Sequence, residues 1–274
     1  MNRIFSGKRL VAFLSTLAVA MAFVPFNGVC AKTEETVQLV NNIVMFAQFD
    51  PLSEKNFMES KTDKAVSMFN DDTTYSSLAK YAETISYGKL KVRSYFPQLE
   101  NGVITPYILK QSRDEYTDYN QYAIEMIENI SVPEDTPLDG NKDGYIDNIV
   151  LVVDGKTTSM ADPLWAKTFH INGLNVNGCI AGSVNLMTGY TLVGSEIFNG
   201  IGTVCHEFLH SMGYPDLYRK DTSSGSPVGQ WDIMSTASIF LQYPLAYQRY
   251  KVSGWLDAEN ITENGTYTLA PASL

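Results

Sequence analysis

Cysteine is scarce in this sequence, and its scarcity excludes one class of fold. The 274 residues include three cysteines, too few for a domain built on disulfide bonds. Cys30 lies in the N-terminal segment, residues 1–31, that is predicted below to be cleaved, which leaves Cys179 and Cys205 in the remainder of the chain. These two thiols either pair in an oxidising compartment or stay free in the interior, and their spacing does not decide between the two.

Basic residues are also few. The chain has 20 Lys and Arg against 30 Asp and Glu, a formal net charge of −10 at pH 7. Such an excess of negative charge is repelled by phosphate backbones and by anionic membrane surfaces. We therefore expect no nucleic-acid partner.

Long apolar runs are lacking except near the N-terminus. A basic start is followed by the run Leu10 to Phe23, and Val29 and Ala31 stand at the two positions that a signal peptidase reads. We predict a signal peptide over residues 1–31, with an uncleaved anchor as the alternative. Cleavage leaves 17 basic against 30 acidic residues, a net charge of −13. The mature chain is then expected to be secreted, without stable membrane association.

The apolar patterning of the remaining chain predicts alternating strands and helices. Val37 to Phe49 and Ile149 to Val153 are expected to form buried strands, because both are rich in β-branched residues. Leu90 to Phe96 alternates and predicts a third strand, and Asn177 to Met187 an edge strand. Helices are predicted over residues 75–86, 119–130 and 200–212, and a last one from Pro244 to Tyr250.

Histidine is as scarce as cysteine, with three residues in the chain, and its distribution is uneven. Two of the three histidines, His206 and His210, lie four residues apart in one predicted helix. Positions i and i+4 share a helix face, so both imidazoles can reach one metal ion. Glu207 completes the HExxH motif. Gly213 lies where the helix can end and the chain can turn back, and Asp216 can then supply a third, anionic ligand.

This residue set favours hydrolytic zinc chemistry. A catalytic zinc keeps three protein ligands and leaves one position for water. Zinc lowers the pKa of that water from about 15.7 to about 7, and an adjacent carboxylate can take its proton. We predict His206, His210 and Asp216 as zinc ligands and Glu207 as general base. The alternative, a chance HExxH on an ordinary helix, is disfavoured by the spacing of Gly213 and Asp216.

Met234 follows Asp216 by 18 residues, within VGQWDIMS. By itself it is typical of a core methionine. Together with the extended motif, it fits the Met-turn that underlies the ligands in metzincins.

The segment HEFLHSMGYPDLY followed by VGQWDIMS resembles the immune inhibitor A-type secreted metallopeptidases of bacteria, which are similar to metzincins but carry aspartate in place of the third histidine. Three more segments are similar to that family: LVNNIVMFAQFD, SLAKYAETISYGKLKVRSYF and LDGNKDGYIDNIVLVVDG. The motifs span most of residues 37–258. The resemblance implies that His206, His210 and Asp216 bind zinc, that Glu207 is catalytic, and that Met234 forms the Met-turn.

The sequence departs from this family in two places. The family often has a histidine just after a Leu-Trp pair, but Leu164-Trp165 is followed here by Ala166, and the nearest histidine is His170. We interpret His170 as a surface or core histidine. The family also commonly carries C-terminal β-rich domains, whereas this sequence stops within the alternating stretch Tyr267 to Leu269. We expect a fragment, or a protein lacking those domains.

A separate acidic segment matches the first nine positions of a calcium loop. Oxygen donors stand at positions 1, 3, 5 and 9, a backbone carbonyl at 7, and glycine at 6 for the sharp turn. Position 12 is Val150 rather than glutamate, so the EF-hand is incomplete. The candidate calcium ligands are Asp139, Asn141, Asp143, Tyr145 and Asp147. The alternative is a solvated acidic turn.

Together these features predict an α+β, zincin- or metzincin-like catalytic domain over residues 32–274. It is expected to have a mixed twisted sheet, an active-site helix and a Met-turn, with a cleft between an N-terminal part ending near residue 212 and a C-terminal part over 213–274.

We predict a zinc endopeptidase acting on proteins or peptides. The alternatives are a catalytically silent metal-binding or adhesive module and a non-peptidase zinc hydrolase. Tyr243 and Tyr247 are nearby candidates for a transition-state tyrosine, but nothing selects either.

Overall fold

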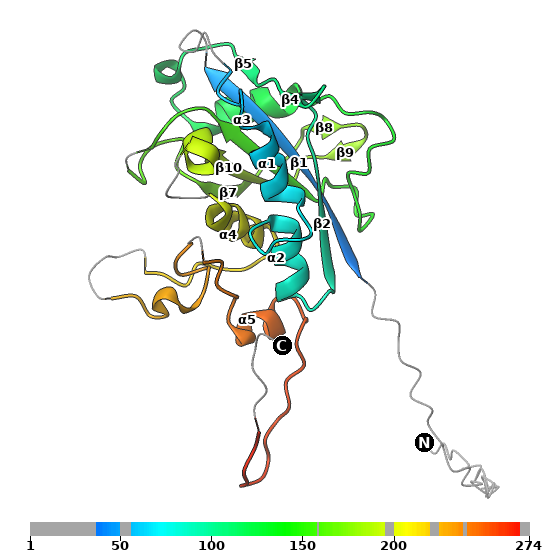
Figure 1. Ribbon diagram of the computed structural model, residues 1–274, viewed down its shortest axis with the longest axis vertical. Helices are drawn as coiled ribbons and strands as arrows, with labels where there is room; N and C mark the ends of the chain where they lie inside the picture. The colour runs from blue at the N-terminus through cyan, green and yellow to red at the C-terminus, as the bar shows by residue number, and fades with distance from the viewer. Residues whose placement is uncertain are drawn as a thin grey trace, which may run out of the picture. The chain divides into compact units, whose positions relative to one another are not determined.

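A mixed β-sheet forms the centre of the protein. The computed structural model describes residues 37–49, 56–157, 159–194, 200–219, 225–237 and 240–268, so the predicted signal peptide lies outside it (Figure 1). The strand order is β2-β1-β6-β10-β7, with β5 beside the end of β1. Strands β1, β2, β5, β6 and β10 run parallel and β7 antiparallel. The strands are β1 (Gln38–Phe49), β2 (Leu90–Tyr95), β5 (Tyr107–Leu109), β6 (Asn148–Val153), β7 (Lys167–His170) and β10 (Ser183–Thr188).

Alternation along the strands gives the sheet two apolar faces. In β1, Val44 and Phe46 belong to one core cluster, while Ile43 and Met45 belong to the other. Successive side chains of a strand point to opposite faces, so a strand buried on both faces must be apolar almost throughout. The first cluster includes residues of α1 (Thr62–Asn70), α2 (Leu78–Ile85) and α4 (Ile201–Ser211), and the second includes residues of α3 (Tyr119–Glu128). Helices therefore cover both faces.

The shorter elements connect this framework. They are the strand pairs β3 (Leu99–Glu100) with β4 (Val103–Ile104) and β8 (Asn175–Val176) with β9 (Cys179–Ile180), the 3-10 turns η1 (Arg113–Glu115) and η3 (Gly229–Trp231), the π-helical turn η2 (Tyr190–Gly194), and α5 (Ala246–Lys251).

The predicted mixed sheet, its three apolar strands and the four predicted helices are confirmed to within a few residues. The predicted edge strand, Asn177 to Met187, is wrong. Strand β10 has neighbours on both sides and is buried along nearly its whole length, and the edge strand is β7. Strand β7 escaped prediction because KTFH has no apolar run. Tyr267 and Thr268 form no strand, and Leu269 lies outside the described residues.

Helix α1 was also missed. Its apolar residues Ala65, Met68 and Phe69 do recur at helical spacing, and all three are buried. The helical pattern was hard to recognise in the sequence, because polar residues surround these three positions and no side chain caps the start of the helix.

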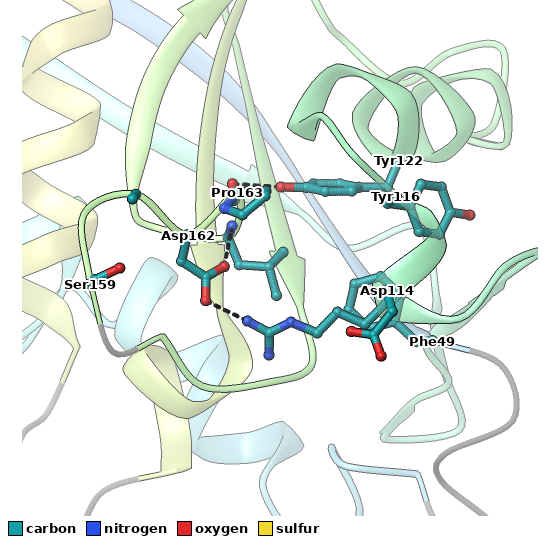
Figure 2. A pocket seen from close by; sticks show the side chains of 10 residues that line it. Phe49, Asp114, Tyr116, Tyr122, Ser159, Asp162 and Pro163 are labelled. Carbon is teal, nitrogen blue, oxygen red and sulfur yellow. Dashed lines mark hydrogen bonds and ion pairs between the residues drawn. The ribbon is translucent and has the colours of Figure 1, made fainter.

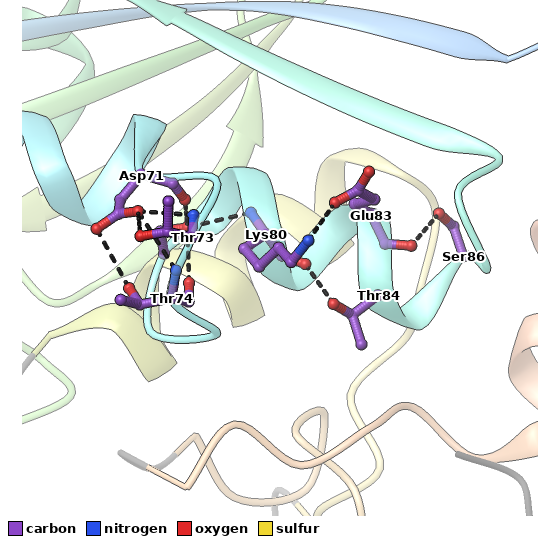
Figure 3. A network of polar contacts seen from close by, with 8 residues as sticks. Asp71, Thr73, Thr74, Lys80, Glu83, Thr84 and Ser86 are labelled. Carbon is purple, nitrogen blue, oxygen red and sulfur yellow. Dashed lines mark hydrogen bonds and ion pairs between the residues drawn. The ribbon is translucent and has the colours of Figure 1, made fainter. Parts of the chain in front are cut away.

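Side-chain hydrogen bonds hold the turn between α1 and α2 (Figure 3). The Asp71 carboxylate accepts from the backbone nitrogen and the hydroxyl of Thr73, at 2.8 and 2.6 Å, and these bonds lower the pKa of Asp71. Ser77 caps α2 by accepting from the backbone nitrogen of Lys80 at 3.1 Å. Capping satisfies a backbone donor that the helix itself cannot pair, so α2 begins at a defined residue.

The two cysteines are free thiols on opposite faces of the sheet. Cys205, in α4, is buried in the first core cluster, and Cys179, in β9, packs against the second. The question of pairing is thus answered in favour of free thiols. No helix among the described residues has both the length and the apolar character needed to span a bilayer.

Two isoleucines on helices provide a matched test of this packing. Ile85 of α2 is 1% exposed and Ile124 of α3 is 39% exposed. We expect Ile85→Ala to lower the free energy of unfolding by about 2–5 kcal/mol, because it leaves a cavity in the core. Ile124→Ala should cost less than about 1 kcal/mol. Urea denaturation of both variants measures the difference, and equal losses would contradict the assignment of the core.

Candidate active site

Helix α4 carries the HExxH motif along one side of the sheet. Val204, Cys205, Phe208 and Leu209 are buried in the first core cluster, so the apolar stripe of the helix faces that cluster, and the helix packs against β10 and β7. The helix then ends as predicted. Gly213 has φ +88, a left-handed conformation that glycine adopts without steric cost, and the chain turns back there.

That turn brings Asp216 to the two histidines. The Nε2 atoms of His206 and His210 lie 3.1 Å apart. Asp216 Oδ1 lies 3.0 Å from His210 Nε2 and 3.4 Å from His206 Nε2. It is buried and accepts no hydrogen bond. A buried carboxylate oxygen without a donor is costly unless a cation completes it, so this trio fits a metal ion.

Backbone carbonyls orient both imidazoles for metal binding. His206 Nδ1 lies 2.9 Å from the carbonyl oxygen of Ile233, and His210 Nδ1 lies 2.7 Å from that of Tyr214. A carbonyl oxygen only accepts, so each Nδ1 carries the hydrogen and each Nε2 keeps its lone pair for the shared centre. Two facing lone pairs repel unless a cation lies between them.

The turn containing Met234 supports the same centre. Met234 is fully buried, and its carbonyl oxygen accepts from the backbone nitrogen of Leu217 at 2.9 Å. Asp232 closes the turn, because its carboxylate accepts from the backbone nitrogens of Met234 at 2.7 Å and Leu245 at 2.6 Å. The turn thus contacts the segment that follows Asp216, and its Ile233 carbonyl holds His206.

Glu207 lies beside the metal trio and lines a pocket of about 300 Å³. Its side chain is almost fully buried, and Oε2 accepts a hydrogen bond from the Thr168 hydroxyl at 2.8 Å. Burial raises the pKa of Glu207, whereas His206 and the Thr168 hydrogen bond lower it. A carboxyl group whose pKa rises toward neutrality is a better proton acceptor in catalysis.

Residues from four segments line this pocket. They are Thr157, Met160, Trp165 and Ala166 before β7; Thr191; Thr203, His206 and Glu207 on α4; and Tyr218, Ser235 and Ala237 on either side of the Met234 turn. Ala166, where the resembled family often has histidine, is among them. His170 is exposed and lies near Tyr145, outside this pocket, so its interpretation as a surface residue is confirmed.

The loop that carries Trp165 is anchored from its other side (Figure 2). Arg113 Nη2 lies 2.6 Å from Asp162 Oδ2, and the Tyr122 hydroxyl donates to the Pro163 carbonyl oxygen at 2.7 Å. These contacts border a second pocket of about 400 Å³. They hold one wall of the Glu207 pocket in place.

Tyr218 is the titratable residue of this pocket lining that sequence reasoning missed. Its ring stacks on that of His206 with centroids 6.4 Å apart, and burial together with the charge of Asp216 raises the pKa of Tyr218 to about 12. The feature of the sequence that could have indicated Tyr218 is its position two residues after Asp216, a predicted ligand. Of the two tyrosines considered from sequence, Tyr243 stacks on Tyr75 and Tyr247 is exposed, and neither lines the pocket.

The acidic loop adopts the expected turn but does not gather its carboxylates. Asp139 accepts from the backbone nitrogens of Asp143 and Gly144, at 3.1 and 2.8 Å, and Gly144 has φ +89. Asp147 turns instead to the backbone nitrogen of Asn41, at 2.7 Å. Within the described part of the chain, His206, His210 and Asp216 form the one cluster of three or more such side chains whose ligand atoms all lie within 4.8 Å of one another.

Removal of the third ligand should weaken metal binding. We expect Asp216→Ala to lower the affinity for a divalent transition metal by more than about 100-fold, since partners outside the ligand set already contribute about 10–100-fold. The control is Asp257→Ala, at an exposed position. Competition with a chromophoric chelator measures both affinities. If the two variants bind equally, Asp216 is not a ligand.

Comparison with known proteins agrees with this geometry. The family model described as immune inhibitor A peptidase M6, catalytic domain, matches residues 82–244, a span that includes all of the metal trio, Glu207 and Met234. A comparison with curated proteins finds no match. The family match covers more than half of the sequence, and the chain therefore belongs to the immune inhibitor A metallopeptidases.

Proposed function

We propose that this peptidase is a zinc-dependent endopeptidase in which Glu207 is the general base. The observation that carries the proposal is the convergence of His206 Nε2, His210 Nε2 and Asp216 Oδ1 beside the Glu207 pocket. Two neutral imidazoles and one carboxylate are a donor set that suits zinc. Zinc bound there would supply Lewis acidity and make a bound water more acidic.

Residues of the protein would carry out proton transfer, orient the histidines and support the ligands. Glu207 would accept the proton of the attacking water and return it to the leaving amine, as its burial and its place in the pocket favour. The carbonyls of Ile233 and Tyr214 keep both histidines in the tautomer that binds metal. Met234 would act as a Met-turn, an apolar support that limits the movement of the ligands.

An extended peptide would bind along β7. This strand is the edge of the sheet beyond β10, so its outer backbone groups can pair with a substrate strand. Thr168 of β7 contacts Glu207, which places the edge next to the proposed base. The edge strand was predicted at residues 177–187, but the edge that we propose for substrate pairing is Lys167–His170.

Casein hydrolysis tests the mechanism. We expect Glu207→Gln to lower kcat/KM by about 100- to 10,000-fold, because the general base is lost. The metal ligands are unchanged, so metal content should equal that of the wild type. The same substitution at the exposed Glu128 is the matched control and should leave activity unaltered.

Equal hydrolysis by the Glu207→Gln variant and the wild type would contradict the mechanism. A wild type that binds zinc stoichiometrically but cleaves no protein or peptide would favour the silent metal-binding module.

We also propose that the loop 139–147 binds calcium with a structural role. The backbone hydrogen bonds to Asp139 and the left-handed Gly144 form the turn that such loops need. A cation would offset the charges of Asp139, Asp143 and Asp147, and the Asn41 contact of Asp147 ties the loop to β1. Asp147 would have to turn toward the other carboxylates on binding.

Thermal unfolding tests the calcium proposal. Calcium at about 100 times its Kd should stabilise the protein by about 2.7 kcal/mol. That corresponds to a rise in Tm of about 5–10 °C. A chelator that removes calcium and spares zinc should reverse the rise, and the double variant Asp139→Asn, Asp143→Asn should not respond. An unchanged Tm in the wild type would rule out the site.

Secretion by a bacterium is part of the same proposal. It rests on the N-terminal basic and apolar segment with Val29 and Ala31 before the cleavage point, and on the acidic mature chain.

A further inference from the structure

A row of buried polar side chains crosses the sheet on the face that α4 covers. It contains Ser94 of β2, Asn42 of β1, Asn148 of β6 and Asn185 of β10, all at most 5% exposed. Asn42 lies opposite both Ser94 and Asn148 in the strand register, and Asn185 lies opposite Thr168 of β7. The row thus extends across the sheet to its edge.

Hydrogen bonds connect the members of this row. Asn148 Nδ2 donates to Asn42 Oδ1 at 3.0 Å and to Asn185 Oδ1 at 2.8 Å. Asn42 Nδ2 donates onward to Ser94 Oγ at 3.0 Å. On the other side, Asn185 Nδ2 donates to Thr168 Oγ1 at 2.9 Å. Asn148 therefore donates to both of its neighbours, and Asn185 donates onward to β7 and the active-site helix.

The direction of these hydrogen bonds determines to which group the Thr168 hydroxyl donates. The Thr168 oxygen accepts from Asn185, so its own hydrogen is available to Glu207, whose Oε2 lies 2.8 Å away and whose carbonyl oxygen lies 2.9 Å away. Asn185 Nδ2 also lies 2.9 Å from that carbonyl oxygen. The charged carboxylate is the stronger acceptor, and a polarised chain of donors strengthens the bond.

The row does not serve stability alone. Asn148 Oδ1 is buried without a hydrogen-bond partner. Burying amides between two apolar layers costs more than burying valine or leucine of similar size, above all when one acceptor stays unsatisfied. The neighbouring residues of the same strands, such as Val44 and Val150, are apolar. A role at the Glu207 end would explain why polar residues form a hydrogen-bonded row at this level of the sheet.

We propose that Thr168 and Asn185 are positioning residues for Glu207, an inference that rests on the proposed function. Thr168 holds Oε2 and thereby leaves the other carboxylate oxygen to face the pocket. Asn185 orients the Thr168 hydroxyl and also contacts the Glu207 carbonyl and the Ser211 hydroxyl, so it fixes the helix turn that carries the base.

The test compares variants of Thr168 in the full chain. Thr168→Val keeps the shape of the side chain but removes the hydroxyl, and we expect kcat to fall about 10- to 100-fold, the range typical of such supporting partners. KM should change by less than about twofold, because the proposed substrate pairing uses the backbone of β7, whereas the substitution changes only a side chain that contacts Glu207. Thr168→Ser keeps the hydroxyl and should restore most of kcat. Asn185→Leu should lower kcat as Thr168→Val does.

Thr62→Val is the matched control, since Thr62 is buried, accepts from the Ile104 backbone nitrogen at 3.0 Å, and lies outside the site. It should lower Tm and leave kcat unaltered. A crystal structure of the Thr168→Val variant provides a readout that does not depend on activity. It should show the Glu207 carboxylate displaced from its wild-type position, with the metal content unchanged.

Three results would overturn the inference: wild-type kcat in Thr168→Val, equal loss in Thr168→Val and Thr168→Ser, or an unmoved Glu207 in the crystal structure. If the Asn185→Leu variant keeps the wild-type kcat, Asn185 is not a positioning residue for Glu207. A wild type without peptidase activity contradicts the proposed function instead, and the crystal structure still tests the positioning role.

Discussion

The packing of α4 against β7 and β10 is the constraint on which the site depends. One face of this helix is apolar and completes the first core cluster, while His206, Glu207 and His210 occupy the rest of its surface. Asn185 and Thr168 join the helix to the sheet at the level of Glu207. The position of the proposed base is therefore set by the same contacts that bury the helix.

The proposed metal ligands are held by backbone groups from segments that follow α4. Ile233 and Tyr214 provide carbonyls for the two histidines, and Gly213 reverses the chain so that Asp216 returns to them. A backbone acceptor cannot be removed by substitution at its own position. The acceptors that orient the two histidines are therefore insensitive to side-chain substitution at Ile233 and Tyr214, and the position of the Ile233 carbonyl depends on the turn closed by Asp232.

Much of the fold followed from local patterns. Strands β1 and β6 were recognisable because both faces of the sheet are covered, which requires nearly continuous apolar residues. Strand β7 was not, because an edge strand of four residues, KTFH, is only partly buried and has no periodic signal. The order of the strands was equally hidden: β10, expected at the edge, is an inner strand, and the unpredicted β7 lies at the edge, since tertiary packing determines which strands are neighbours.

By itself the sequence determined the resemblance to the family and the proximity of His206, Glu207, His210 and Asp216, because helical spacing and one glycine turn place these residues within a single short segment. Only the tertiary structure decided what surrounds them. Tyr218 in the pocket, Thr168 on the carboxylate and the amide row behind it come from elements whose proximity depends on strand order and register. The free state of the two cysteines was decided in the same way, because the sheet lies between them.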